Sequence, residues 1–161
     1  MSALRLIMAL VLASLLSQFP AFSDQYVQRL GGQVDALSRV AGEFDASATK
    51  AGLTREAALA DLSGSAFRDT HQDDMRTVFS RLDKARADLE LLRKATPLER
   101  MTLPQRFRDL ETLTATWHDF KPALPITTSG LIAAAVGFAI GWMLAVIIGM
   151  LFPRRQRLGW R

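Results

Sequence analysis

The chain has 161 residues, of which 49% are hydrophobic, and a formal net charge of +4. A basic balance can indicate nucleic-acid binding, but here the excess lies at the two ends of the chain. Residues 24–125 hold 15 Lys and Arg residues against all 16 acidic residues, a net charge of −1. The other basic residues are Arg5, Arg154, Arg155, Arg157 and Arg161. Cysteine is absent, which excludes disulfides and thiolate metal sites.

The first apolar run extends from Leu6 to Phe22 and follows Arg5. Two interpretations are open. The basic start, the apolar middle and the small residues around Phe22 are typical of a signal peptide with its cleavage site. The other interpretation, which we favour, is a retained transmembrane helix over residues 1–23, because small residues form a stripe along it that a discarded leader would not need.

The central segment, residues 24–125, is predicted to be helical throughout. Apolar residues at alternating spacings of three and four indicate two long helices that form an antiparallel coiled-coil hairpin. The first seam is Val27, Leu30, Val34, Leu37, Ala41, Phe44 and Ala48, and the second is Met75, Val78, Leu82, Ala85, Leu89 and Leu92. Because these seams contain much alanine, we expect a third helix or a second copy to cover them.

Glycine and proline mark the breaks in this segment. Gly52 followed by Thr54 predicts a helix end and then the N-cap of a short helix to about Leu62. Pro104 predicts the start of a third long helix, with its seam at Phe107, Leu110, Thr114 and Trp117. Gly31-Gly32 interrupts the first seam, either as a hinge or close helix crossing, or as a tolerated weak position.

The last apolar run, residues 126–152, contains no charged residue and predicts a second transmembrane helix. Residues 153–161 form a basic tail with Arg154, Arg155, Arg157 and Arg161, whereas Lys121 is the single cation close to the other end of the run. The positive-inside rule therefore predicts a cytoplasmic C-terminus. If the first helix is retained, the N-terminus is cytoplasmic too, and residues 24–125 lie in the periplasm of a Gram-negative cell.

Small residues recur every fourth position in both apolar runs. The first stripe is Ala9, Ala13 and Ser17, and the second is Ala133, Gly137, Gly141, Ala145 and Gly149. Small residues let helix backbones approach closely in lipid, so we expect the two stripes to pack together, within one chain or between copies. The alternative is an accident of composition, since Ala and Gly are common in membrane helices.

Residues that could perform chemistry are sparse. His71 lies among Asp69, Asp73 and Asp74, but this spacing does not bring a ligand set to one helix face, and we interpret it as a solvated acidic helix start. His118 is interpreted as a neutral surface histidine. Motifs for a nucleophile, a phosphate loop or paired carboxylates are missing from the sequence. We therefore expect no catalytic, cofactor-binding or metal site, and no enzymatic activity.

Five short motifs occur in order along nearly the whole chain. They are Ser17-Gln18-Phe19-Pro20, Gln28-Arg29-Leu30-Gly31-Gly32, Pro97-Leu98-Glu99-Arg100, Phe120-Lys121-Pro122-Ala123-Leu124-Pro125 and Gly137 to Trp142. In this combination the chain resembles the domain of unknown function 2937 family of proteobacterial membrane proteins. The resemblance implies a small inner-membrane protein without a known activity, and a first helix that continues past Pro20 instead of being cleaved. It supplies no functional residues.

These observations predict an all-α protein in which two transmembrane helices flank a periplasmic helical bundle. Its most favoured role is structural: a membrane-anchored scaffold whose hairpin binds a partner, either a second copy or another inner-membrane protein. The alternative is an accessory signalling or sensor subunit that acts through a partner, because the nine residues after Phe152 are too few for an output domain. Nucleic acid and a small-molecule substrate are not expected.

Overall fold

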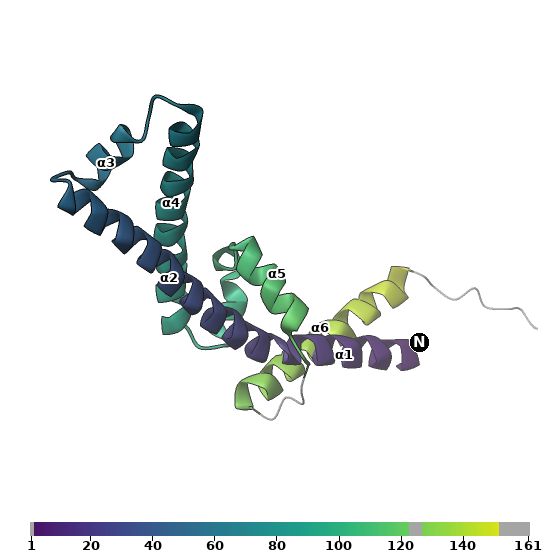
Figure 1. Cartoon of the computed structure of the whole chain (residues 1–161). Coiled ribbons are helices and arrows are strands. Elements are labelled where there is room, and N and C mark those ends of the chain that lie inside the picture. Colours follow the sequence, from purple (N-terminus) through teal and green to yellow (C-terminus); the bar gives the residue numbers. More distant parts are fainter. Residues whose placement is uncertain (1, 123–126, 152–161) are drawn as a thin grey trace, which may run out of the picture. The chain divides into compact units, whose positions relative to one another are not determined.

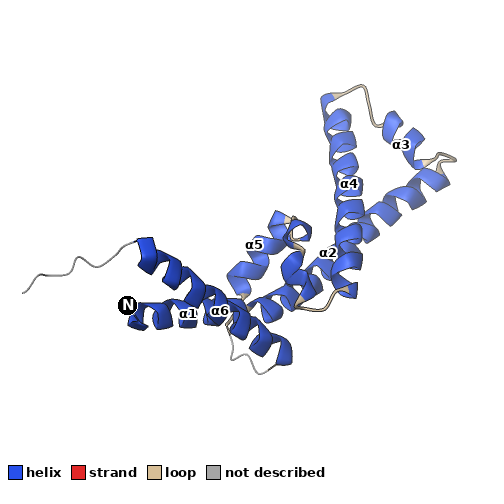
Figure 2. Ribbon diagram, turned by 180° about the vertical axis from the view of Figure 1, so that it is seen from behind, coloured by secondary structure: helices blue, strands red, loops and turns tan. Residues whose placement is uncertain are grey.

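The computed structural model describes residues 2–122 and 127–151, and every regular element in these ranges is a helix (Figures 1 and 2). In chain order these are α1 (Ser2–Ser17), α2 (Phe19–Lys50), α3 (Arg55–Asp61), α4 (Ala66–Lys94), the 3₁₀ turns η1 (Glu99–Thr102) and η2 (Pro104–Arg106), α5 (Leu110–Asp119) and α6 (Thr128–Leu151). The all-α prediction is confirmed. The chain divides into two compact units, which we call the helix-pair unit (residues 1–23 and 120–161) and the central unit (residues 24–119).

The helix-pair unit is built on α1 and α6, which pack against each other. Gln18 separates α1 from α2, and its amide bonds the carbonyl of Leu15 three residues back, which tightens the end of α1. Pro20 follows in the first turn of α2, where a missing N–H is tolerated. Both α1 with its continuation and α6 are long and apolar enough to cross a membrane, and the mean hydropathy over an 18-residue window of α6 is 2.6.

The core of the central unit lies between α2, α3 and α4. It contains Tyr26, Val27, Leu30, Val34, Ala41, Leu59, Met75, Phe79, Leu82, Ala85, Leu89 and Leu92, with Leu37, Phe44, Phe107 and Leu113 packed against it. Each position of the two predicted long seams is buried or half-buried, so both seams are confirmed. Phe79 was not in the predicted seam.

The two long helices diverge toward α3, which lies between their ends (Figures 1 and 2). Aromatic and ionic contacts close this end of the central unit. The rings of Phe44 and Phe79 meet edge to face with centroids 5.5 Å apart. Arg55 covers the Phe79 ring at 4.2 Å and also donates to Asp45 at 2.7 Å, so it joins α3 to both long helices.

The predicted break after the first long helix is confirmed. Gly52 has φ +72°, a left-handed conformation that glycine adopts without the penalty of a Cβ atom. Thr54 is the N-cap of α3, and its side chain accepts a hydrogen bond from the Ala57 amide. At the next turn Gly64 has φ +93°, and Ser65 caps α4 in the same way by accepting from the Arg68 amide.

The predicted third long helix is wrong in its start and in its buried face. Pro104 begins the short turn η2, and α5 starts six residues later, because the Asp109 carboxylate accepts a hydrogen bond from the Thr112 amide at 2.9 Å and caps the helix there. The buried side chains of α5 are Thr112 and Thr116. Leu110 and Trp117, which the seam placed inside, are 71% and 74% exposed.

Gly31 and Gly32 lie within an unbroken stretch of α2. Gly31 is buried, and a Cβ atom there would come within 2.9 Å of the Arg93 guanidinium. Gly32 is exposed, with open space where a Cβ atom would lie. Gly31 therefore marks a close approach of the Arg93 side chain to α2, whereas Gly32 is a position that tolerates glycine.

Candidate functional site: a glycine-lined helix contact and an arginine–carboxylate cluster

The contact between α1 and α6 is a backbone-to-backbone contact at two glycines. A Cβ atom on Gly137 would come within 2.9 Å of the Ala13 Cα atom, and one on Gly141 within 2.6 Å of the Ala9 Cα atom. These distances are too short for any side chain larger than hydrogen, and the obstructing atoms are backbone. Since the position on α1 falls by four as that on α6 rises by four, the two helices are antiparallel.

The other small residues follow this contact along both helices. Ala9, Ser17, Ala133 and Ala145 are buried, whereas Ala13 and Gly149 are half-buried. Gly130 is also buried and extends the second stripe by one turn toward the start of α6. The Ser17 hydroxyl donates to the Ser14 carbonyl at 2.7 Å, so it places no unsatisfied polar atom in the interface.

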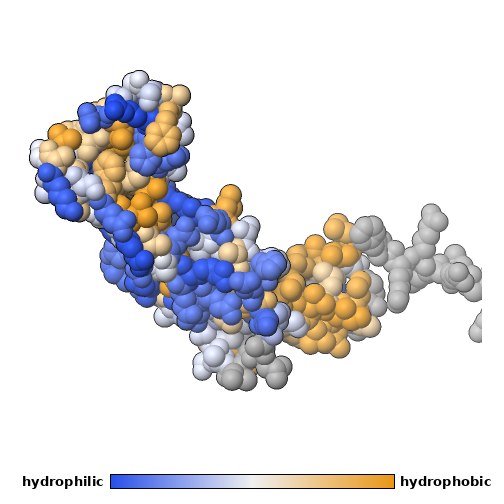
Figure 3. Space-filling view, viewed as in Figure 1, coloured by the Kyte–Doolittle hydropathy of each residue, from blue (hydrophilic) through white to orange (hydrophobic). Residues whose placement is uncertain are grey.

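The opposite faces of α1 and α6 are exposed and apolar. Figure 3 shows hydrophobic colour over this pair, whereas the visible surface of the central unit is mainly hydrophilic. Most of the large exposed hydrophobic side chains are on these two helices, with Leu15 at 63% and Met150 at 72% exposure as examples. A patch of this extent is far larger than a soluble monomer normally exposes, and it has the composition of a lipid-facing surface.

A second cluster in the central unit surrounds Asp88, a buried residue of α4. Its carboxylate accepts hydrogen bonds from Arg108 Nε at 2.6 Å and from Arg106 Nη1 at 3.2 Å. Both arginines belong to the segment between α4 and α5, so one buried charge holds that segment against α4. The Tyr26 ring packs near this point on Phe107, with centroids 4.6 Å apart, and burial raises the pKa of Tyr26 to about 12.

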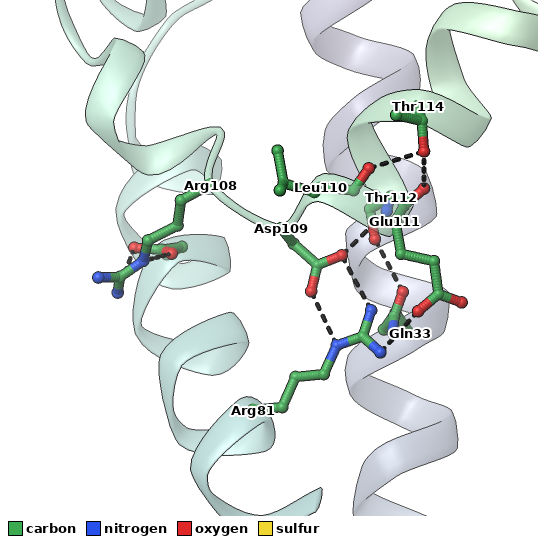
Figure 4. Close-up of polar contacts among 9 residues, drawn as sticks. Gln33, Arg81, Arg108, Asp109, Leu110, Glu111, Thr112 and Thr114 are labelled. Atoms are coloured by element: carbon green, nitrogen blue, oxygen red, sulfur yellow. Dashed lines mark hydrogen bonds and ion pairs between the residues drawn. The ribbon is translucent and has the colours of Figure 1, made fainter. Parts of the chain in front are cut away.

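The start of α5 is attached to α4 by a second arginine, as Figure 4 shows. Arg81 donates two hydrogen bonds to Asp109, at 2.9 and 3.0 Å, and also pairs with Glu111 at 2.6 Å. Burial alone would raise the pKa of Asp109, but the bonds from Arg81 and Thr112 outweigh it and hold the pKa below its usual value. The Thr112 hydroxyl also donates to Gln33 of α2 at 2.7 Å, so α5 is attached to both long helices.

Two further ion pairs close the end of the central unit where its first and last residues lie. Arg100 is buried, donates to the Leu92 carbonyl at 2.8 Å, and pairs with Asp24 at 2.6 Å. Arg29 pairs with Asp119 at 2.6 Å. The start of α2 is thereby connected to η1 and to the end of α5. Arg29 and Arg100 belong to two of the motifs on which the family resemblance rests, and in the structure each forms an ion pair that holds helices together.

The cluster leaves an open groove of about 860 Å³ between α4 and α5. One wall is formed by Arg76, Ser80 and Lys84, which are spaced by four on α4, and the other by Asp109, Leu110 and Glu111. Of the acidic residues that line the groove, Asp109 and Glu111 are engaged by Arg81, and Asp88 is engaged by Arg108. Arg76 and Lys84 are exposed on its rim. The groove was not predicted, because it depends on how the segment before α5 folds back on α4.

Of the two histidines, His118 lies beside the Arg29–Asp119 ion pair. The His71 ring stacks on Phe67 at 6.3 Å, and His118 is exposed with Nδ1 3.0 Å from Asp119. Within residues 2–122 and 127–151 no three His, Cys, Asp or Glu residues are grouped as a metal site requires. The orientation residues Arg154, Arg155, Arg157 and Arg161 lie outside the described residues.

Comparison with known proteins gives one match. The model of a family described as "Protein of unknown function (DUF2937)" matches residues 1–157. No curated protein and no solved structure matches the chain.

Proposed function

The chain belongs to the DUF2937 family of proteins of unknown function, and from that premise we propose that it is an anchored interaction protein of the bacterial inner membrane. In this proposal α1 is retained, α1 and α6 cross the bilayer as a pair, and the central unit lies in the periplasm. The central unit presents a surface to a protein partner and carries out no chemistry of its own.

The observation that carries the proposal is the glycine contact between α1 and α6. Two apolar helices that touch through Gly137 and Gly141 expose their large side chains on the outside, which is the arrangement suited to lipid on all other faces. A cleaved leader would leave these glycines facing lipid with no close partner. The contact therefore supports retention of α1.

The orientation rests on the charges at the ends of the apolar runs. Four arginines follow α6, and Arg5 precedes the first run, whereas Lys121 is the basic residue close before α6. Cytoplasmic segments are enriched in Lys and Arg, so both termini are assigned to the cytoplasm. The arginine tail would add about 1 kcal/mol of attraction per residue to an anionic leaflet.

The groove between α4 and α5 is the surface most suited to a partner. Its acidic residues are engaged within the protein, and exposed Arg76 and Lys84 remain on α4 for an acidic segment of another protein. The walls of the groove are fixed by the Arg81 and Arg108 ion pairs, so a partner would meet a preformed surface.

Site-specific photo-crosslinking in living cells tests this role. A benzophenone side chain at Ser80, on the groove wall, is expected to give one defined crosslinked species that contains a second membrane or periplasmic protein. The matched control places the same group at Ala60, which is exposed on α3. Crosslinks from Ser80 that contain only this chain, or none above the Ala60 level, would remove the hetero-partner role.

A further inference from the structure

Arg5 lies on the packed face of α1, in line with the small residues that contact α6. Gly141 lies against Ala9, and successive contacts move by four residues along the two helices in opposite directions. One step further, the same register places Arg5 beside Ala145, which is 2% exposed. A cation therefore continues the stripe where the next small residue would be expected.

The guanidinium of Arg5 has no opposing charge within its own unit. The residue is partly exposed, and its Nε atom is buried without a hydrogen-bond partner among the described residues. The helix-pair unit contains no Asp or Glu, because all 16 acidic residues lie in the central unit. In the proposed topology that unit is on the other side of the bilayer. A buried donor without a partner is costly, so a partner for Arg5 has to come from outside the chain.

Arg5 is at the depth where the apolar part of the helix pair begins. It is three residues, about 4.5 Å, from Ser2, where α1 begins, and Ala145 is six residues, about 9 Å, from Leu151, where α6 ends. The first apolar run starts directly after Arg5, at Leu6. An arginine at this boundary keeps its aliphatic stem on apolar surface and directs its guanidinium toward the lipid headgroups.

We propose that Arg5 binds the phosphate of an anionic phospholipid at the cytoplasmic end of the helix pair. A guanidinium can donate two parallel hydrogen bonds to a phosphate, which supplies both the missing acceptor and the missing charge. Leu4 and Ile7, three positions apart and 49% and 57% exposed, give the acyl chains an apolar surface next to it. The inference rests on the proposed membrane anchor and its orientation, and adds one binding residue and a class of lipid.

Electron spin resonance of the full chain in bilayers tests the site. The protein is reconstituted in phosphatidylcholine with a trace of spin-labelled phosphatidylglycerol or spin-labelled phosphatidylcholine. Lipids that contact transmembrane helices give a motionally restricted component, and its size for each label measures relative affinity. We expect wild type to prefer phosphatidylglycerol severalfold, and Arg5→Gln to lose most of this preference because the amide carries no charge.

Three controls separate a site at Arg5 from other sources of the preference. Lys121→Gln also removes one cation from the helix-pair unit, but Lys121 precedes α6 whereas Arg5 lies beside its last turns, so this variant should keep the preference. Arg5→Lys should keep most of it, because an ammonium group still pairs with phosphate. Inorganic phosphate, added to wild type at constant ionic strength, should leave it unchanged. Unchanged helical circular dichroism verifies that each variant is folded.

The outcomes distinguish this inference from the membrane anchor. A restricted component of equal size for both labels in wild type would overturn the lipid site and leave the anchor standing, whereas no restricted component for either label would overturn both. Equal losses in Arg5→Gln and Lys121→Gln would assign the preference to total charge. Equal losses in Arg5→Lys and Arg5→Gln would assign it to packing of the arginine stem. Loss on addition of inorganic phosphate would assign the site to a free anion. Each of these three results overturns the proposal.

Discussion

Asp88 carries a buried negative charge that the loop after α4 neutralises. Its side chain is 4% exposed, whereas those of Arg106 and Arg108 are 33% and 48% exposed. Asp88 is the one carboxylate that both arginines share, so its loss removes both ion pairs between this loop and α4 at once. The two arginines can then turn to water, whereas loss of an arginine would leave a buried carboxylate with less opposing charge.

The variant Asp88→Asn is therefore expected to destabilise the central unit by about 2 kcal/mol. That is below the roughly 3–5 kcal/mol for a fully buried pair, since both arginines reach solvent. Urea unfolding of the full chain in detergent, followed by helical circular dichroism, measures the change. Asp73→Asn, on an exposed position of the same helix, is the control and should leave the unfolding midpoint unchanged. Equal effects of the two variants would contradict the role of Asp88.

Asp109 gives the central unit a dependence on pH with a defined sign. Its pKa is below the usual value in the folded state, so the stabilisation from its ionised form is complete above the unfolded pKa, about 3.9, and is lost as the pH falls through the folded value. Asp109→Asn lacks this contribution at every pH, while asparagine can still cap α5. The difference in unfolding free energy between wild type and variant should be largest near pH 7 and shrink below about pH 4. If the difference in unfolding free energy is constant with pH, the charge of Asp109 does not contribute to stability.

At the scale of helices, the contact between α1 and α6 is the one most sensitive to the size of its side chains. Gly137→Leu or Gly141→Leu would force a side chain into backbone atoms of α1, and overpacking of this kind typically costs about 1–3 kcal/mol or more. We expect a lower melting temperature for the full chain in detergent. The matched control is Ala139→Leu, because Ala139 is exposed on the same helix. Unchanged melting of the two glycine variants would mean that the stripe reflects composition alone.

Among the helices, some features could be predicted from the sequence and others could not. The two long seams could be predicted from spacing alone. Apolar residues such as Leu30 in the first seam and Leu82 in the second repeat with the period of the helix, and this pattern can be recognised without knowing what the helix packs against. The predicted buried face of α5 was wrong because either of two sides of this helix could be buried. The side that is buried is the one that meets α2, where Thr112 bonds Gln33. A polar seam of threonines has no signal in a pattern of hydrophobic residues.

The arginine–carboxylate cluster could not be predicted for a related reason. Asp88 lies three positions after Ala85, on the side of α4 that faces the core, and a carboxylate there is a signal that an opposing charge must be nearby. Which arginines supply it is not encoded locally, because Arg106 and Arg108 reach Asp88 only after the chain turns back through η1 and η2. The stripes of α1 and α6 were visible in the sequence, but their register, with Ala13 at Gly137, was not.

For the whole molecule, the absence of cysteine makes the proposed topology directly measurable. Ser63→Cys places one thiol in the exposed turn between α3 and α4, and Gln156→Cys places one in the arginine tail. In cells with a permeabilised outer membrane, an impermeant maleimide is expected to label the first variant, and to label the second only after the inner membrane is broken. The reverse pattern would invert the proposed orientation, and labelling of both in intact inner membranes would exclude two crossings.

The antiparallel contact of α1 with α6 also fixes an order of events during synthesis. Ala13 and Gly137, which meet in the finished protein, are separated in the sequence by the whole central unit. At about 5–20 residues per second, a ribosome needs on the order of ten seconds to make the intervening chain. During that interval α1 has no α6 to pack against, and α2, α3 and α4 are complete before α6 is made. The α1–α6 contact is thus the last part of this protein to form, and in the proposed topology a chain truncated before α6 would leave the central unit attached to a single unpaired helix.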